Sequence, residues 1–437
     1  MHIGIRREDK NEWERRVPLV PDDLKELKEK YGIETVIQPS KIRFFTEDDY
    51  RDAAVEVNED ISKANSIFAV KEIPKELFLE GKTYMFFAHV IKGQHHNLPM
   101  LRRMMELKCN LIDYERVVTE KNQRLIFFGR FAGLAGIMET LHAYGQKLKL
   151  QGYSTLFEEI KQPYEYGILE NAQEGLRRIS ENLKIIGFPK EVSPIVVGFT
   201  GYGHVSKGAQ ELFDILPHIT LSPDELIKDY EKIKGDDRNL YKVVFKEEDI
   251  VRRKNGQFDL QEYYDHPELY ESKFEEYLPY ISILVNCIYW SEKYPRLVTK
   301  KYLRKASSSG RKQKLQVIGD ISCDIDGSIE FTYKVTKPDV PTFTYFADSD
   351  SFKDAVQKEG VTVMAVDNLP CEFPRRASME FSSILKNYIY EIASADFNKS
   401  FNELNLSYPI KTALILHKGE LTEEYKYLQQ FINAELK

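Results

Sequence analysis

The sequence predicts an α/β protein of two domains, and three observations support this. The chain has 437 residues, more than a single hydrophobic core ordinarily holds together. Short apolar runs alternate with helical patterns over residues 1–130 and again after residue 185, as in layered α/β folds. A glycine turn, Gly201-Tyr-Gly203, separates the apolar run Ile195–Thr200 from a helical stretch.

The first domain is predicted over residues 1–134. Helices are expected from Asp22, where Leu24 and Leu27 share a face, after a cap near Thr46, and through Leu101–Leu107. The expected strands are Ile3–Ile5, Thr35–Gln38, Ser66–Val70, Thr83–Ala88, Leu111–Asp113 and Leu125–Phe128.

Two helices are expected to link the domains over residues 135–184. The first runs from Phe131 to Gly152 and begins with small residues, which suits close packing at a domain junction. The second covers Ala172–Leu183. A further long helix begins at Pro374, and its apolar stripe indicates that the C-terminal helices of residues 370–437 pack back on the first domain and complete it.

The second domain is predicted over residues 185–369, with a Tyr-rich surface insertion at residues 224–280. The basic, Ser-rich stretch at residues 300–314 is interpreted as a solvated loop. The expected strands are Ile195–Thr200, His218–Leu221, Tyr241–Phe245, Ile281–Cys287, Leu315–Ile321 and Val361–Val366.

Composition narrows the function classes. A net charge of −7 argues against a nucleic-acid partner, and no apolar run approaches the roughly 18 residues of a membrane span. The first residues enter a strand at once, so no signal peptide is expected, and four scattered cysteines form no disulfide pattern. These features favour a cytoplasmic protein.

The glycine turn predicts a dinucleotide site. Gly201 permits the tight turn, Gly203 lets the backbone approach a pyrophosphate, and the helix N-terminus at His204 and Val205 would bind it. Ser206 stands where a third glycine is usual, so the motif by itself is weak evidence. The strand before it and the helix after it favour a Rossmann-like domain.

The second strand of such a domain usually ends in a carboxylate that binds the ribose hydroxyls. Here that strand is expected to end at Leu221, and Ser222 follows it. Because a hydroxyl does not repel a 2′-phosphate, Ser222 favours NADPH, with NADH as the alternative.

Ionisable residues follow two apolar strands of the first domain. Lys71 and Glu72 follow one strand and His89 follows the next, so Lys71 and His89 could form an acid/base pair. For any one of them alone, a charge on the surface at a strand end is the commoner explanation. Arg16 and Arg124 could bind carboxylates, or could be ordinary solvated arginines, and Glu115 is equally open.

A metal site is not favoured. His95 and His96 lie near His89, but no cysteine or carboxylate set completes a ligand group. Nucleophile-elbow, P-loop and kinase motifs are also absent from the sequence.

Several characteristic segments occur in this order along the chain: Ile5-Arg-Arg-Glu-Asp-Lys-Asn-Glu-Trp-Glu-Arg-Arg-Val-Pro-Leu19, Phe86-Phe-Ala-His-Val-Ile-Lys-Gly-Gln94, Phe128-Gly-Arg-Phe-Ala-Gly-Leu-Ala-Gly136, residues 201–210, residues 320–331 and Val366-Asp-Asn-Leu-Pro370. The first of them resembles the start of the alanine dehydrogenase and saccharopine dehydrogenase group. The others show a closer resemblance to the lysine–2-oxoglutarate reductase part of the bifunctional aminoadipic semialdehyde synthases. The Tyr-rich insertion is similar to this reductase branch.

The resemblance implies two Rossmann-like domains with the active site in an inter-domain cleft, the second domain binding the dinucleotide. It implies that lysine and 2-oxoglutarate condense and are reduced by NADPH to saccharopine. At the matching positions, Lys71 and His89 would be catalytic. Substrate would be bound by Arg16, Glu72, Lys92, Glu115 and Arg124, and the cofactor by Gly201, Gly203, His204, Val205, Ser222 and Asp320.

Three alternatives remain open. The chain could form lysine from saccharopine, it could reduce another pair of amine and oxo acid, or it could be a non-catalytic nucleotide sensor. A homo-oligomer is compatible with the sequence, and neither a nucleic-acid nor a membrane partner is expected.

Overall fold

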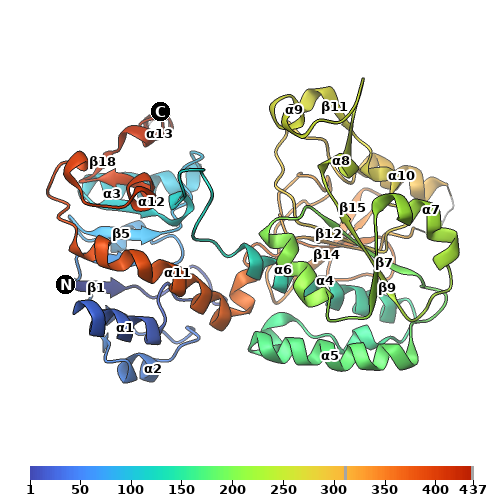
Figure 1. The fold of residues 1–437 in the computed structure, drawn as a ribbon, viewed down its shortest axis with the longest axis horizontal. Helices are drawn as coiled ribbons and strands as arrows, with labels where there is room; N and C mark the ends of the chain where they lie inside the picture. Colours follow the sequence, from blue (N-terminus) through green and yellow to red (C-terminus); the bar gives the residue numbers. More distant parts are fainter. Residues whose placement is uncertain (310–312, 435–437) are drawn as a thin grey trace. The chain divides into compact units, whose positions relative to one another are not determined.

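The computed structural model describes residues 1–309 and 313–434, and it divides into two compact units. Unit 1 comprises Met1–Phe128 together with Pro374–Lys437, and unit 2 comprises Gly129–Phe373 (Figure 1). Each unit contains a largely parallel sheet with helices, which confirms the predicted two-domain α/β class. The expected limit at residue 134 falls inside helix α4 (Gly129–Leu150), six residues beyond Phe128, where the first segment of unit 1 ends.

Unit 1 is built on a sheet in which distant parts of the chain pair. The pairings from β6 to β3 are parallel, whereas β17 pairs antiparallel with both β6 and β18. The central strands are buried on both faces, as parallel strands usually are. In spatial order the strands are β18 (Glu420–Leu421), β17 (Leu414–His417), β6 (Asn110–Asp113), β5 (Thr83–Phe86), β4 (Ser66–Phe68), β1 (His2–Ile5), β2 (Glu34–Ile37) and β3 (Glu56–Val57).

The helices of unit 1 follow local sequence signals. Helix α1 starts with a proline at its first position, has acidic residues in its first turn, and ends at Gly32, whose φ of 63° is left-handed. Helix α11 buries the predicted apolar stripe in the same core as β1 and α1. The helices are α1 (Pro21–Tyr31), α2 (Glu47–Asp52), α3 (Leu98–Glu106), α11 (Pro374–Ser394), α12 (Tyr408–Ala413) and α13 (Leu428–Ala434).

The sheet of unit 2 has one unexpected feature in its strand order. The strand beside β7 is β9, and the intervening strand β8 lies beyond it at the edge. The hairpin of β14 and β15 extends the opposite edge and runs antiparallel to β16. In spatial order the strands are β15 (Ser351–Asp354), β14 (Thr342–Phe346), β16 (Val361–Met364), β13 (Val317–Asp320), β12 (Ile283–Asn286), β7 (Ile195–Thr200), β9 (Leu240–Phe245) and β8 (His218–Leu221).

Helices α4 and α6 of unit 2 pack at very short range. A Cβ added to Gly133 would lie 2.0 Å from the Val205 carbonyl oxygen, and one added to Gly208 would lie 2.1 Å from that of Arg130. Only glycine therefore fits at these two crossing points. The helices of unit 2 are α4 (Gly129–Leu150), α5 (Leu169–Ile186), α6 (His204–Phe213), α7 (Pro223–Ile233), α8 (Glu247–Ile250), α9 (Leu260–Asp265) and α10 (Lys300–Ser308).

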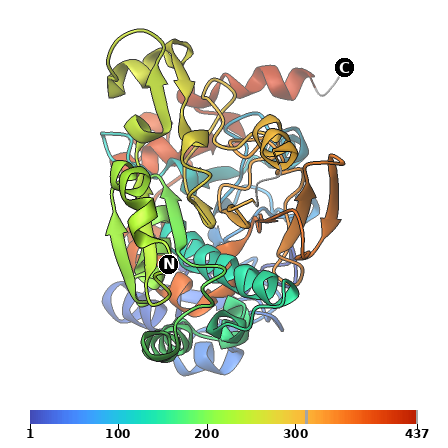
Figure 2. The same cartoon turned by 90° about the vertical axis from the view of Figure 1, so that its right-hand side faces the viewer.

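Three local predictions are wrong. Residues 224–280 are not only a surface insertion, because they contain the internal strand β9. Their remaining part forms most of α7, and also α8, α9 and the ribbon of β10 (Val251–Arg253) and β11 (Tyr270–Ser272), which gather at one end of unit 2 (Figure 2). Leu125–Phe128 form no strand, and the expected loop at 300–314 begins as helix α10, with residues 310–312 outside the described part.

Unit 2 also holds two buried carboxyl groups, Glu139 of α4 and Glu372, which we call the buried carboxyl pair. Glu139 is 0% and Glu372 1% exposed. The Gln162 amide donates to both Glu139 oxygens, at 3.2 and 3.4 Å. Burial raises the pKa of Glu139 to about 7 and, with the repulsion of Glu139, raises that of Glu372 well above its ordinary value. The raised pKa values of the two carboxyl groups therefore favour a protonated form of the buried carboxyl pair.

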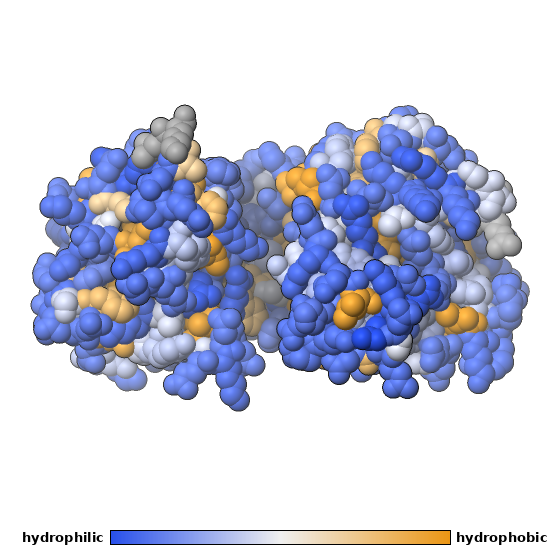
Figure 3. All heavy atoms as spheres, turned by 90° about the horizontal axis from the view of Figure 1, so that it is seen from above, coloured by the Kyte–Doolittle hydropathy of each residue, from blue (hydrophilic) through white to orange (hydrophobic). Residues whose placement is uncertain are grey.

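The face of the molecule that Figure 3 shows is mainly hydrophilic. In Figure 3 the hydrophobic residues of the visible face stand in small separate groups among hydrophilic ones. Among the described residues, no helix combines the length and the apolar character that crossing a membrane requires.

Candidate active site

The predicted catalytic residues of unit 1 follow the carboxyl ends of neighbouring parallel strands. Lys71 and Glu72 come after β4, His89 after β5 and Glu115 after β6. Because these strands are parallel and adjacent, their ends meet at one edge of the sheet. Ligands of open α/β sheets bind at this edge.

Glu72 and His89 form the centre of this group. The Glu72 carboxylate is 2.7 Å from His89 Nδ1 and accepts a hydrogen bond of 2.8 Å from Lys10 Nζ. Burial opposes ionisation of Glu72, but the hydrogen bonds and charges of His89 and Lys10 outweigh it and hold its pKa well below the ordinary value. Glu72 is therefore an anion that orients the imidazole.

Lys71 lies beside them in a partly buried position. Burial lowers the pKa of its amine, and the positive charge of Arg16 lowers it further. Its backbone is held by Glu8, whose carboxylate accepts from the N–H groups of Val70 and Lys71, at 2.6 and 3.0 Å. A lowered pKa makes the neutral amine, the form that can accept a proton, easier to reach.

The backbone at His89 has an unusual conformation. Its φ of 47° is left-handed, which is uncommon for a residue other than glycine. The buried amide of Asn97 donates to the carbonyls of Ala88 and His89, at 3.2 and 3.1 Å, and so stabilises this turn. The Phe87 ring stacks on the imidazole, with centroids 6.1 Å apart. His89 is thus held from several sides.

The predicted substrate-binding cations differ in their surroundings. Arg16 is 2% exposed and its Nε donates to Glu14 at 2.7 Å, so it belongs to a buried ion pair. Its guanidinium carbon lies 4.2 Å from the centroid of the Phe128 ring. Arg124 is exposed and donates to Glu115 at 2.7 Å, which pairs two of the predicted residues with each other.

Lys92 is the third cation predicted to bind substrate. It is exposed, and its backbone N–H donates to the Gln94 side chain at 3.0 Å. His95 and His96, which follow it, are also exposed. The binding roles of Lys92, Arg16 and Arg124 remain predictions.

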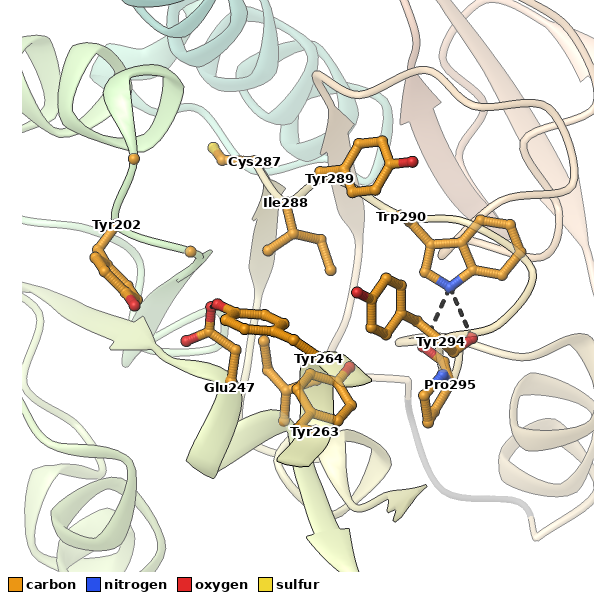
Figure 4. Close-up of a pocket in the computed structure, with 13 residues that line it drawn as sticks. Tyr202, Glu247, Tyr263, Tyr264, Cys287, Ile288, Tyr289, Trp290, Tyr294 and Pro295 are labelled. Atoms are coloured by element: carbon orange, nitrogen blue, oxygen red, sulfur yellow. Dashed lines mark hydrogen bonds between the residues drawn. The ribbon is translucent and has the colours of Figure 1, made fainter. Parts of the chain in front are cut away.

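The glycine loop of unit 2 forms the tight turn before a helix that the sequence predicted. Gly201 has a φ of 81°, and Gly203 precedes the first residue of α6, His204. A Cβ added to Gly203 would meet nothing within 4 Å, so open space adjoins the backbone there. The loop and Glu247 line a cavity of about 440 Å³ (Figure 4). Binding of a pyrophosphate at this helix N-terminus, by His204 and Val205, remains a prediction.

Ser206, at the usual third glycine position, is fully buried in α6. The Gln210 amide donates to its hydroxyl at 2.9 Å. A small side chain whose hydroxyl is satisfied within the helix does not obstruct the loop. The close helix contact for which such motifs use their third glycine is made here by Gly208, against Arg130.

Asp320 is the last residue of β13 and is 1% exposed. It accepts hydrogen bonds from Asn286, Ser322 and Thr332, at 2.8, 2.8 and 2.7 Å. These bonds tie the ends of β12 and β13 together. A direct contact of Asp320 with the cofactor remains a prediction, whereas its hydrogen bonds give it a structural role.

Ser222 does not lie where the prediction required. It caps helix α7, and its hydroxyl bonds to the Glu225 carboxylate at 2.9 Å. The prediction assumed that β8 neighbours β7, but β9 occupies that position and is followed by Lys246 and Glu247. The premise that favoured NADPH is therefore wrong for this fold.

Sequence reasoning missed several residues that position the group in unit 1. Glu8, Lys10 and Glu14 all lie in the first matching segment. No spacing rule indicated that Glu8 contacts Lys71, that Lys10 contacts Glu72 or that Glu14 contacts Arg16. Asp113 was also missed. It is fully buried, and burial with the nearby Glu115 charge raises its pKa to about 7.

Comparisons with known proteins agree with this architecture. Residues 4–135 match the model "Alanine dehydrogenase/PNT, N-terminal domain", and residues 260–424 match "Alanine dehydrogenase/PNT, C-terminal domain". The solved structure of L-alanine dehydrogenase superimposes with a TM-score of 0.62, covering 100% of both chains at 16% identity. At that identity the likeness shows the fold alone.

Two relatives extend the match in sequence. The alpha-aminoadipic semialdehyde synthase of Arabidopsis thaliana is 36% identical over 98% of this chain and 41% of its own length. The saccharopine dehydrogenase [NAD(+), L-lysine-forming] of Emericella nidulans is 26% identical over 88% of this chain and 90% of its own. The chain therefore spans under half the length of the first relative.

These matches confirm the resemblance predicted from the sequence and the predicted enzyme class, an oxidoreductase with a nicotinamide dinucleotide-binding fold. Both family models occur in their natural order, and together they cover most of the chain. The chain belongs to the alanine dehydrogenase/PNT family.

Proposed function

We propose that this protein condenses the ε-amine of lysine with the keto group of 2-oxoglutarate and reduces the product to saccharopine. The observation that carries the proposal is the group of Lys71, Glu72 and His89 in unit 1. The proposal also draws on the relative that is 36% identical over 98% of the chain.

The reaction defines what these residues must do. The amine nitrogen attacks the keto carbon, a carbinolamine forms, and loss of water leaves an imine. The nicotinamide, when bound, supplies the hydride that reduces the imine carbon. Protons must therefore leave the lysine ammonium and reach the departing hydroxyl, which are the tasks of a general base and a general acid.

Lys71 suits the base, because burial and the charge of Arg16 lower the pKa of its amine. His89 suits the acid: the Glu72 carboxylate holds its Nδ1, so Nε2 would be the nitrogen that donates a proton to the substrate. Arg16, Arg124 and Lys92 are the cations proposed for the substrate carboxylates, and Glu115 is proposed to receive an ammonium. Arg124 would exchange Glu115 for a substrate carboxylate on binding.

The decisive assay follows oxidation of NADH and of NADPH at 340 nm in the presence of lysine and 2-oxoglutarate. Turnover that depends on both substrates, with saccharopine identified by mass spectrometry, supports the proposal. Ornithine in place of lysine and pyruvate in place of 2-oxoglutarate test the alternative substrate pairs. Saccharopine with the oxidised dinucleotide tests the reverse direction.

Variants test the residue roles. Lys71→Met and His89→Gln should each lower kcat by roughly 10²–10⁴-fold, the usual contribution of a general acid or base. Lys75→Met and His95→Gln are matched controls, because both residues are exposed outside the group, and they should keep normal turnover. Near-normal kcat in both active-site variants would refute the acid/base assignment, and dinucleotide binding without turnover of any amine would favour a sensor.

A further inference from the structure

Asp113 is a fully buried carboxyl group of unit 1 to which the proposed mechanism gives no task. It is the last residue of β6 and stands opposite Phe86, the last residue of β5, in the parallel pairing of the two strands. It therefore lies at the edge of the sheet where His89 follows one strand and Glu115 follows the other. Burying a carboxyl group is costly unless nearby groups compensate its charge.

The two oxygens of this carboxyl group have different surroundings. Oδ1 accepts a hydrogen bond of 2.9 Å from the Glu115 N–H and so caps the short turn Tyr114–Arg116. Oδ2 is buried and has no hydrogen-bond partner within the described part of the chain. The capped turn carries Glu115, whose carboxylate accepts from Arg124 at 2.7 Å. One oxygen thus holds the backbone of a predicted substrate-binding residue, and the other depends on the charges around it.

The charges next to Asp113 act in opposite directions. Burial and the negative charge of Glu115 raise the pKa of the Asp113 carboxyl to about 7, although the Glu115 N–H and the positive charge of protonated His89 act against them. The attraction to His89 is mutual, because two opposite charges favour each other's charged form equally. Asp113 therefore changes its charge in the pH range in which histidine side chains ordinarily titrate.

Two phenols and an ion pair also surround Asp113. Burial raises the pKa of the Tyr114 and Tyr425 hydroxyls, and the charge of Asp113 raises both further, so these groups stay neutral in this range. Arg116 donates to the Tyr425 hydroxyl at 2.9 Å and forms an ion pair with Glu424. The strongest positive charge that acts on Asp113 is that of the imidazole.

We propose that Asp113 is a positioning residue: it fixes the turn that carries Glu115, and its negative charge stabilises the protonated imidazole of His89. Glu72 already holds the imidazole through Nδ1, at 2.7 Å. Asp113 adds a second negative charge from the end of β6. A general acid must enter the reaction protonated, so this second charge extends to higher pH the range in which His89 can donate. The inference rests on the proposed function for the task of His89, but not for the interaction between the two side chains.

The first test follows the histidine rings of the full chain by NMR with ¹⁵N-labelled histidine, between about pH 5 and pH 9, without substrates or dinucleotide. His89→Gln identifies the His89 signal. Asp113→Asn removes the negative charge and keeps an oxygen that can accept the Glu115 N–H. In this variant the His89 imidazole should lose its proton at a pH lower by about half a unit, because solvent at the half-buried ring screens part of the attraction. Glu424→Gln, which removes an exposed carboxylate from the neighbouring ion pair, should leave the His89 titration unchanged.

A reciprocal measurement keeps Asp113 in place. In His89→Gln, NMR of aspartate labelled with ¹³C at the side-chain carboxyl should show the aspartate that titrates near pH 7 in the native chain ionising at higher pH, because the opposing positive charge is gone. The signal missing from Asp113→Asn assigns it. This measurement decides the question also where Asp113→Asn does not fold.

Steady-state kinetics with lysine and 2-oxoglutarate test the consequence for turnover. In Asp113→Asn the alkaline limb of the kcat profile should move to lower pH while KM changes little, which a merely structural defect would not produce. Asp113→Ala, which also removes the cap of the turn, should in addition raise KM for lysine, since Glu115 is proposed to receive an ammonium.

Unchanged titrations of His89 in Asp113→Asn and of Asp113 in His89→Gln, or an alkaline limb that stays in place, would overturn the inference. Because the NMR measurements need no substrate, a chain that shows the coupled titration but does not turn over lysine would keep this inference and fail the proposed reaction.

Discussion

Replacing Gly208 with alanine should separate α6 from α4. The added Cβ would lie 2.1 Å from the Arg130 carbonyl oxygen and 2.9 Å from its carbonyl carbon, where an ordinary contact needs more than 3 Å. Both atoms belong to helix backbone, so no side-chain rotation relieves the clash, and one helix must move by about an ångström.

The cost follows from this geometry. Overpacking a core typically costs about 1–3 kcal/mol, and a rigid backbone neighbour places Gly208→Ala at the upper end. Alanine recovers up to about 1 kcal/mol through its helix propensity. A net loss of about 2 kcal/mol corresponds to a fall of about 4–8 °C in the unfolding midpoint of a unit of this size.

Circular dichroism during heating measures the change in midpoint. Calorimetry measures NADH affinity, which should fall because the N-terminus of α6 is predicted to bind the pyrophosphate. Gly175→Ala in α5 is the matched control. There the nearest atom to an added Cβ is Cε1 of the Tyr166 side chain, at 3.0 Å, and the ring can move. A Gly208→Ala protein as stable as Gly175→Ala would refute the reasoning.

Three further outcomes are expected. Glu372→Gln should raise the unfolding midpoint at pH 8 and change it little at pH 5. A buried carboxyl whose pKa is raised in the folded state contributes its full stability below its unfolded pKa, and this stability is lost as the pH rises through the folded pKa. The folded pKa is about 7 for Glu139, the other member of the buried carboxyl pair. Unfolding curves of both proteins from pH 5 to 8 check this, and an equal difference at every pH would contradict it. Asn97→Ala should release the left-handed turn at His89, so that kcat falls by a larger factor than KM rises. A purely structural loss would not separate the two constants in this way. Steady-state kinetics at a temperature where both proteins stay folded measures both constants. Arg16→Met should destabilise the protein by about 3–5 kcal/mol, because it leaves the buried Glu14 carboxylate without its partner. Denaturant unfolding measures the loss of stability. Restored stability in the double variant Arg16→Met/Glu14→Gln would confirm the cause.

Much of the fold was predictable because its signals are local. The strands Ile195–Thr200 and His218–Leu221 and the cap at Thr46 were read from apolar runs and capping residues, and they agree with the structure. The weakly apolar hairpin of β14 and β15 was missed. The strand β9 was predicted, as Tyr241–Phe245, but was included in a surface insertion because the residues around it in sequence are polar. Its neighbours in space are β7 and β8.

By itself, the sequence determined the two-domain α/β class, the family resemblance and the identity of the strand-end residues Lys71, Glu72 and His89. These follow from periodicity, motif order and the rule that ligands bind at the carboxyl ends of parallel strands. Only the tertiary structure decided that Glu8 and Asn97 position this group, and that Glu247 rather than Ser222 stands beside the glycine loop. The physical reason is the order of the strands in the sheet. Which strand pairs with β7 depends on contacts between segments far apart in the chain, and a local sequence pattern does not specify such contacts.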